Sequence, residues 1–379
     1  MRIAIVMPRT SRMGRDRLNS METVALTLAR SSAYRNSIVI VCEEGAEVCA
    51  APDMTVRVPG GLGKTLHAQT VLAVLRDLRP DIVEFHQQLE TSARLARRLG
   101  GTPCVLHRHT RIKPPRHLLD GLRYQARLKA FDRVVLVSEA AREEFLRDYP
   151  ALCDRAAVVC NPIDMAPWRA EVEQKERIIL FSGRAMPEKG LDAFCQALAE
   201  TLDKAPYWRG ALMLGDWERH AQWAEPHVRR LDRFGDRVTI ATSAPISAVQ
   251  DITRRAAIAV TPSRVAEAMG LSALEAHAAG AALISSGRGG LKEASGPHAV
   301  YVDPPDAAAL ARALRELTDD DDRRVTLARE GQAFVARTHS PETRARELDS
   351  LREQILAAEN PMRQTKASGP ASRPRQGGS

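Results

Sequence analysis

Two cations in the second half of the chain lie where a bound phosphate would explain them. Arg184 and Lys189 belong to the loop of "RIILFSGRAMPEKGLDAFCQAL", between a predicted buried strand and a helix that begins near Gly190. A helix N-terminus has unpaired N–H groups and a partial positive charge of about half a unit, so two added cations favour phosphate. The alternative is that Lys189 only pairs with Glu188 or Asp192 on the surface.

Two glutamates occupy an otherwise apolar segment, "EAMGLSALEAHAAG". Gly270 permits a tight backbone before a predicted helix over 271–279, which places Glu267 in the loop and Glu275 near the first turn. Carboxylates accept hydrogen bonds from sugar and ribose hydroxyls, so a bound ligand would explain both residues. Two alternatives remain open: Ser272 and Glu275 have the spacing of a capping box, and Glu267 could be a solvated loop carboxylate.

The segments that must position these residues alternate between short β-branched runs and helical periods. About six predicted strands, from "RIAIVM" to "AAVVC", precede the proline-bearing segment 161–176, and about six follow it. This alternation predicts an α/β fold with parallel sheets covered by helices on both faces. We expect two Rossmann-like, doubly wound domains that face each other across a cleft at the carboxyl ends of their strands.

The predicted boundaries divide the chain into four parts. The first domain is expected at 1–165 and the second at 166–340. A long final helix is expected at 341–358, with Ser340 as N-cap and Pro341 at the first helical position. The remaining residues, 359–379, are predicted to be a disordered tail, because the segment after Asn360 contains four basic residues, no acidic ones, and Pro, Gly and Ser throughout.

Composition limits the cellular setting and the partners. The 379 residues are 44% hydrophobic and contain no apolar run near the roughly 20 residues that a bilayer span needs. The opening "MRIAIVMPRT" resembles a buried strand more than an export signal, and six cysteines without a C-x-x-C pair fit a reducing compartment, so we expect a cytoplasmic protein. The formal charge of +8 allows anionic partners, but with 4% aromatic residues and no recognition motif we expect no nucleic acid binding.

Residues 178–340 resemble the C-terminal half of the retaining glycosyltransferases of the GT-B fold, family 4. The match consists of "SGRAMPEKGLDAF" followed by "TPSRVAEAMGLSALEAHAAGAALISSGRGGLKE". The resemblance implies that the donor diphosphate is held by two cations, that one glutamate faces the sugar, that a second binds the ribose, and that the helix N–H groups complete the phosphate site. In this sequence the two cations are Arg184 and Lys189. The glutamate that faces the sugar is Glu267, and the one that binds the ribose is Glu275. The N–H groups are those of Gly270, Leu271 and Ser272.

The N-terminal half resembles the same family less closely. "PCVLHRHT" is similar to the strand that delivers a histidine to the cleft, with His109 in that place. The usual glycine pair after the first strand is replaced by "RTSRMGRDRLNS", which leaves Gly14 for a close approach to the sugar. Pro162 and Trp217 stand where the family usually has glycine.

The resemblance implies a function for both domains. The first domain would bind the acceptor, and the second would bind a UDP- or GDP-sugar. The sugar would pass with retention, without a metal, to a hydroxyl of a glycan or lipid-linked acceptor, in cell-envelope polysaccharide or lipopolysaccharide synthesis. Arg116, Arg123 and Arg127 share a predicted helical face that could contact an anionic membrane, although Asp120 on that face can pair with them.

Two other functions stay open, and no metal site is predicted. "VRVPGGLGKTL" is similar to a P-loop ending in Lys64, but Val58 replaces its first glycine, so a nucleoside triphosphatase is a weak alternative. A catalytically silent, glycosyltransferase-like binding protein is the other. We expect His107 and His109 to face opposite sides of a strand and therefore not to share an ion, and "DDDD" at 319–322 to cap a helix.

Overall fold

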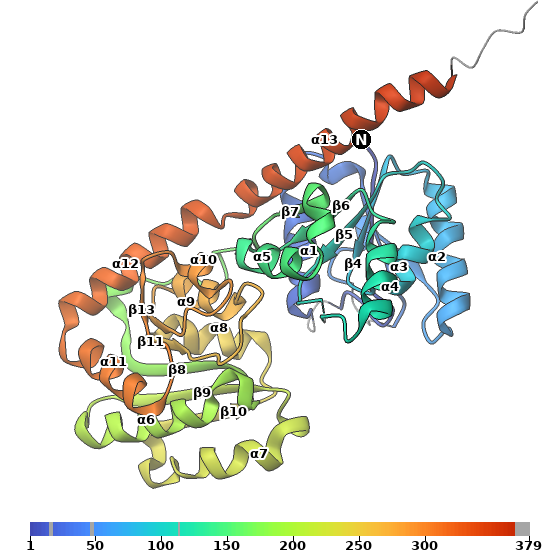
Figure 1. Ribbon diagram of the computed structural model, residues 1–379. Coiled ribbons are helices and arrows are strands. Elements are labelled where there is room, and N and C mark those ends of the chain that lie inside the picture. Colours follow the sequence, from blue (N-terminus) through green and yellow to red (C-terminus); the bar gives the residue numbers. More distant parts are fainter. Residues whose placement is uncertain (15–17, 46–48, 113, 368–379) are drawn as a thin grey trace, which may run out of the picture.

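The computed structural model describes residues 1–14, 18–45, 49–112 and 114–367, and contains two parallel β-sheets covered on both faces by helices (Figure 1). The first sheet uses the N-terminal part of the chain and the second the part from residue 176 onward. The predicted class, α/β with two doubly wound sheets, is confirmed.

The N-terminal sheet has seven strands in the order β3-β2-β1-β4-β5-β6-β7, and all of its pairs are parallel. Alternate residues of a strand point to opposite faces, so Ile3 and Ile5 pack toward α1 while Ala4 and Val6 join the core formed with α2 and α3. The strands are β1 (Ile3–Val6), β2 (Ile38–Glu43), β3 (Thr55–Val58), β4 (Ile82–His86), β5 (Cys104–Arg108), β6 (Arg133–Leu136) and β7 (Ala156–Val158). The helices are α1 (Ser20–Ser31), α2 (Lys64–Leu78), α3 (Leu89–Ala96), α4 (Leu118–Leu128) and α5 (Glu139–Asp148).

One strand was not predicted from the sequence. β3 lies at the edge of the N-terminal sheet, pairs only with β2, and has three of its four side chains partly or fully exposed. The segment "TVRV" therefore lacks the continuous apolar run that marks the buried strands.

The C-terminal sheet has six parallel strands in the order β10-β9-β8-β11-β12-β13. Helices α6, α7 and α11 pack on one face, and α8 and α9 pack on the other. The strands are β8 (Glu176–Arg184), β9 (Arg209–Gly215), β10 (Val238–Thr242), β11 (Ala256–Thr261), β12 (Ala282–Ser285) and β13 (Ala299–Tyr301). The helices are α6 (Leu191–Lys204), α7 (Trp217–Arg229), α8 (Ile246–Arg255), α9 (Leu271–Ala279), α10 (Leu291–Ser295), α11 (Ala307–Asp319) and α12 (Asp321–Thr338).

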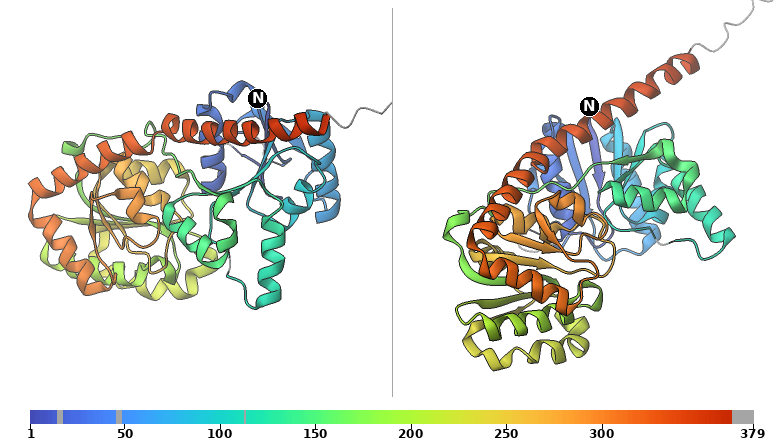
Figure 2. Two further views of the ribbon diagram at one scale, coloured as in Figure 1. Left: turned by 45° about the horizontal axis from the view of Figure 1, so that its top comes forward. Right: turned by 60° about the vertical axis from the view of Figure 1, so that its left-hand side comes forward.

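The final helix, α13 (Pro341–Ala367), returns from the C-terminal half to the N-terminal half (Figures 1 and 2). Ser340 caps it as predicted, because its Oγ accepts the N–H of Thr343 at 3.2 Å. Ala345 and Leu348 enter the core that β1 shares with α1. The helix runs past the expected end at 358, and residues 368–379 of the expected tail lie outside the described residues.

Two further helices begin at segments that the sequence analysis singled out. Asp320, within "DDDD", caps α12, since its side chain accepts the N–H of Arg323 at 2.9 Å. Lys64 is the first residue of α2, with Gly63 as its N-cap. The acidic run is therefore explained as a helix cap.

Candidate active site

A cleft of about 450 Å³ lies between the carboxyl edges of the two sheets. Residues from both halves line it, which matches the position expected for ligands of doubly wound sheets. The cleft brings together every predicted site residue except Gly14: His109, Arg184, Lys189, Glu267, Gly270, Leu271, Ser272 and Glu275.

The two predicted phosphate-binding cations come from the end of β8 and the turn that follows it. Arg184 is the last residue of β8 and is exposed, while Lys189 ends a short 3-10 turn. The next residue, Gly190, has φ +71°, and a Cβ there would lie 2.2 Å from the carbonyl oxygen of Pro262. Only glycine permits this approach, which presses the Lys189 loop against the loop after β11.

Lys189 forms an ion pair with Glu267, with 2.5 Å between Nζ and Oε1. Ser263 also donates to Oε1 of Glu267, at 2.5 Å. The alternative partner Asp192 instead binds Arg264, at 2.7 Å. Both local alternatives are therefore wrong: Lys189 pairs across the cleft wall, and Glu267, with a side chain 16% exposed, is not a solvated loop carboxylate.

Two glycines of "GRGG" hold the loop that carries Glu267. The N–H of Gly290 donates to the carbonyl of Glu267 at 2.8 Å. A Cβ at Gly289, whose φ is +63°, would lie 2.4 Å from that same carbonyl oxygen. The backbone contact positions Glu267 at the cleft, which is a physical reason for two glycines at this point.

Glu275 does not form a capping box. Helix α9 begins at Leu271, and its N-cap is Gly270, with φ +89° and no side-chain cap. Ser272 is thus already inside the helix, and no hydrogen bond of the Glu275 side chain occurs within the described part of the chain. Burial raises the pKa of Glu275 to about 7. The uncapped first turn presents backbone N–H groups at the cleft wall.

The opposite wall contains a group of three histidines. His86 and His107 are paired across β4 and β5, and their rings stack at 4.6 Å with 4° between planes. Nδ1 of His86 lies 2.8 Å from Nε2 of His109, which faces the cleft. The prediction that His107 and His109 face opposite sides is wrong, because residues two apart on a strand share a face. Burial, with the charges of His107 and Arg108, lowers the pKa of His109 to about 3, so its ring is neutral.

A buried ion pair supports this group from behind. Arg352 of α13 is 1% exposed and donates to both oxygens of Glu84, at 2.7 and 2.8 Å. Asp349 accepts from Arg352 and from the hydroxyl of Ser32, each at 2.7 Å. Burial alone would raise the pKa of Glu84, but Arg352 and His107 hold it below its ordinary value. The carboxylate lies 3.5 Å from Nε2 of His107, so α13 reaches the histidine group through Glu84.

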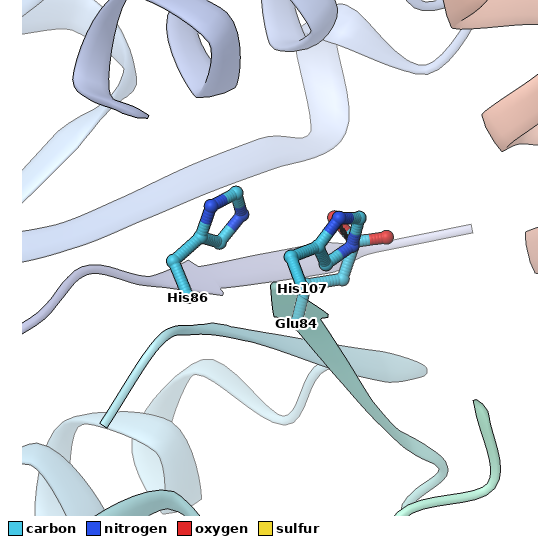
Figure 3. A group of neighbouring side chains, drawn as sticks. All are labelled: Glu84, His86 and His107. Carbon is cyan, nitrogen blue, oxygen red and sulfur yellow. Dashed lines mark ion pairs between the residues drawn. The ribbon is translucent and has the colours of Figure 1, made fainter. Parts of the chain in front are cut away.

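Glu84, His86 and His107 project from the same side of the sheet (Figure 3), with possible ligand atoms within 4.8 Å of one another. Their arrangement does not fit a metal ion. Arg352 occupies both oxygens of Glu84 and adds a buried positive charge, and parallel stacked rings do not aim their nitrogens at one point. The group is a histidine stack on an ion pair.

The sequence analysis did not single out several residues of the site. Asn161 lines the cleft, is 7% exposed, and its Oδ1 has no hydrogen-bond partner among the described residues. Its position in "NPID", at the end of the first half, was the available signal. Arg352 gave no local signal, because its partner Glu84 is 268 positions away.

The two halves also contact each other directly beside the cleft. The carboxylate of Glu293 accepts the N–H groups of Glu139 and Ala140, at 2.7 and 2.8 Å. The hydroxyl of Ser138 donates to the carbonyl of Ala268 at 2.6 Å. Glu293 therefore binds the N-terminus of α5, where a negative charge is favoured.

Comparison with known families assigns the chain. The family described as Glycosyltransferase Family 4 matches residues 21–166, and the one described as Glycosyl transferases group 1 matches residues 176–320. The chain belongs to glycosyltransferase family 4. This assignment leaves the nucleoside triphosphatase alternative without support.

Curated relatives of this family 4 member include enzymes named for one acceptor. The D-inositol 3-phosphate glycosyltransferase of Streptomyces avermitilis is 30% identical over 273 residues, 63% of this chain and 58% of the relative. That of Kineococcus radiotolerans is 31% identical over 239 residues, 55% of this chain and 54% of the relative. The chain thus spans less than two thirds of the length of these relatives.

Solved structures show the GT-B fold for this family 4 member. Sucrose-phosphate synthase from Thermosynechococcus elongatus has a TM-score of 0.76 and 19% identity, over 94% of this chain and 100% of that protein. Anabaena HepE in complex with UDP-glucose has a TM-score of 0.77 and 16% identity, over 93% and 99%.

Two departures from the family pattern have structural explanations. Gly14 forms an isolated antiparallel bridge with Cys49 and does not line the cleft, where Ser20 and Met21 of α1 stand instead. Trp217 begins α7 and packs against the core of the C-terminal sheet. Neither residue contributes to the cleft wall. No helix of the described part is long and apolar enough to span a membrane.

Proposed function

We propose that the protein transfers a sugar from a nucleotide diphosphate sugar to an acceptor hydroxyl, with retention of the anomeric configuration. The observation that carries the proposal is the cleft wall on which Arg184, Lys189, Glu267 and Glu275 meet the uncapped start of α9. Cations, backbone N–H groups and carboxylates thus stand within one site, and each suits a different part of such a donor.

Different residues of the site would bind different parts of the donor. Arg184, Lys189 and the first N–H groups of α9 would bind the diphosphate and stabilise the charge that develops as it leaves, so no metal is required. Glu267, held by Lys189 and Ser263, would orient the sugar. Glu275 would accept hydrogen bonds from the ribose hydroxyls, which favour its ionised form.

Retention follows if the acceptor attacks from the face that the diphosphate leaves. The leaving phosphate then accepts the proton of the acceptor hydroxyl, and no protein base is needed. The neutral ring of His109 faces the cleft and would contribute a hydrogen bond to the acceptor or the sugar.

The acceptor would bind on the N-terminal side. Helix α4 supports the predicted contact with an anionic membrane, because Leu119 and Leu122 are 68% and 54% exposed beside Arg123. Arg127 is not part of that contact, since it lies 3.6 Å from Glu90, and Asp120 accepts the backbone N–H of Arg116. A glycan or lipid-linked acceptor, the cell-envelope role and the cytoplasmic location remain predictions.

Thermal unfolding with UDP-, GDP- and ADP-sugars tests the donor site. We expect one base to raise the melting temperature in the wild type and not in a Glu275→Gln variant. Proton NMR of the product then gives its anomeric configuration. Binding without donor hydrolysis or transfer across the panel would favour the silent binding protein, and an inverted product would overturn the retaining mechanism.

A further inference from the structure

A second cavity, of about 700 Å³, lies in the N-terminal half beside the cleft. We propose that it binds the phosphate of a phosphorylated acceptor, so that the acceptor hydroxyl is presented to the donor sugar. This inference rests on the proposed transfer reaction and names the chemical class of its acceptor. The volume lies in the range of ligand pockets, about 300–1,000 Å³.

The charged residues that line the cavity are mostly positive. Seven cationic residues line it, against one carboxylate, Glu90. Arg9, Lys64, Arg98 and Arg108 have no carboxylate partner among the described residues. Like charges repel one another, so bringing these cations together costs free energy unless an anion binds between them.

The remaining cations serve the structure. Glu90 pairs with Arg94 at 2.6 Å and with Arg127 at 3.6 Å, and Arg111 pairs with Glu144 at 2.9 Å. These pairs account for three of the seven charges and leave the other four available to a ligand.

Arg108 shows most clearly that the cavity is built for an anion. Its Nε is buried without a hydrogen-bond partner among the described residues, and the remaining contacts of its guanidinium are to the carbonyls of Thr110 and Arg111, at 3.4 and 3.3 Å. Burial lowers its pKa to about 10, so the group stays charged at neutral pH. A charged guanidinium that lines the cavity and has no carboxylate partner among the described residues is suited to binding a phosphate.

The location fits an acceptor. Arg9 follows β1, Gln88 follows β4, and the strand order reverses between these two strands, which is where doubly wound sheets bind ligands. Thr110 lines both this cavity and the cleft, and its neighbour His109 lines the cleft. A molecule whose phosphate lies beside Arg108 would therefore place its other end next to His109.

The start of α2 adds to the site. This helix runs from Lys64 to Leu78, and its N-cap Gly63 gives no side-chain cap, while Lys64 and Thr65 line the cavity. Its first N–H groups supply donors and a partial positive charge. The glycine-rich segment that is similar to a P-loop thus opens onto the acceptor cavity.

Binding of small phosphates to the full-length protein tests the site. The probes are inorganic phosphate, glucose 6-phosphate with glucose as its uncharged match, and undecaprenyl phosphate in detergent micelles with undecaprenol as its match. We expect at least one of glucose 6-phosphate and undecaprenyl phosphate to bind more tightly than its uncharged match. The soluble and lipid arms separate a free sugar phosphate from a lipid-linked acceptor.

The variants Lys64→Met and Arg98→Gln should each weaken phosphate binding about tenfold or more, the scale of one lost charged hydrogen bond. Arg76→Gln, an exposed arginine farther along α2, is the matched control and should leave binding unchanged. UDP-sugar binding, measured on the same samples, should not change with Lys64→Met or Arg98→Gln.

Phosphate binding that does not depend on Lys64 and Arg98 would overturn the inference, as would equal binding of the uncharged matches. ATP hydrolysis that depends on Lys64 would assign the cavity to a nucleotide and would also overturn it. Loss of UDP-sugar binding in Glu275→Gln, with phosphate binding intact, keeps the test of the donor site separate from this one.

Discussion

The two walls of the cleft are built in different ways. The C-terminal wall carries its charges on loops after β8 and β11, where Lys189 and Glu267 remain partly exposed, at 20% and 16%. The N-terminal wall carries a stack of histidines on β4 and at the end of β5, supported by the ion pair of Arg352 and Glu84, each 1% exposed. One wall offers charge to a ligand, whereas the other buries its charge behind the residue that faces the ligand.

This difference predicts which substitutions damage the fold and which damage ligand binding. When a buried ion pair loses one partner, the other charge stays behind in a medium of low dielectric constant, which costs stability. When a charge at the cleft loses its partner, water can solvate it. Substitution of a charged residue there should therefore change binding or turnover more than stability.

The largest effect should come from Arg352→Met. It removes the arginine from the buried carboxylates of Glu84 and Asp349 and leaves Glu84 with only His107 beside it, so we expect the free energy of unfolding to fall by about 3–5 kcal/mol. Urea unfolding measures this, with Arg346→Met, an exposed position on the same helix, as control. A loss below about 1 kcal/mol would show that α13 does not hold the N-terminal wall.

Lys189→Ala should act on turnover instead. We expect a decrease of about 10²-fold or more in kcat, the scale of one lost donor that stabilises developing charge. The melting temperature should change little, because Glu267 keeps the hydrogen bond from Ser263 and lies in the partly exposed cleft wall. Turnover close to the wild type would remove Lys189 from the site.

Glu275→Gln should have opposite effects on binding and stability. Burial raises the pKa of Glu275 in the folded protein to about 7 from its ordinary value of 4.5. The folded state therefore binds an extra proton between these values, and the contribution of this group to stability falls as the pH rises through this window. Near pH 8 the variant should melt higher than the wild type and lose its response to the nucleotide sugar.

The same group predicts a pH dependence of donor binding in the wild type. The ionised carboxylate accepts both ribose hydroxyls, so the affinity should rise from about pH 6 to about pH 8. Glu275→Gln should remove this dependence. A variant that melts lower and still binds the nucleotide would restore the helix-cap interpretation.

The smallest effect concerns a real capping box. Asn19 and Glu22 exchange side-chain and backbone hydrogen bonds of 3.0 Å at the start of α1. Asn19→Ala should cost about 1 kcal/mol of stability, whereas Ser272→Ala, at the same spacing from Glu275, should cost less than about 0.5 kcal/mol. Equal costs in urea unfolding would contradict the described start of α9.

Much of the C-terminal wall could be predicted because its signals are local. The strand, the glycine-bearing loop and the helix of "SGRAMPEKGLDAF" lie within a few residues of one another, and so do Glu267, Gly270 and Glu275. The first residue of α9 could not be predicted in this way, because Gly270 and Ser272 are both suitable N-cap residues. The structure has Gly270 as the N-cap, where it packs closely against Leu291. His107 and His109 were misjudged by a wrong strand-facing argument, not for lack of signal.

The sequence by itself determined the two doubly wound sheets, because buried parallel strands require apolar runs that alternate with helices. It also determined which cations and carboxylates belong together along the C-terminal strand ends. Only the tertiary structure decided the return of α13, the Arg352–Glu84 support of the histidine stack, and the basic cavity. The contacts of α13 join residues hundreds of positions apart, and the cavity gathers residues from separate elements between Arg9 and Arg127. The packing of helices on the sheet brings these residues together and leaves no periodic pattern along the chain.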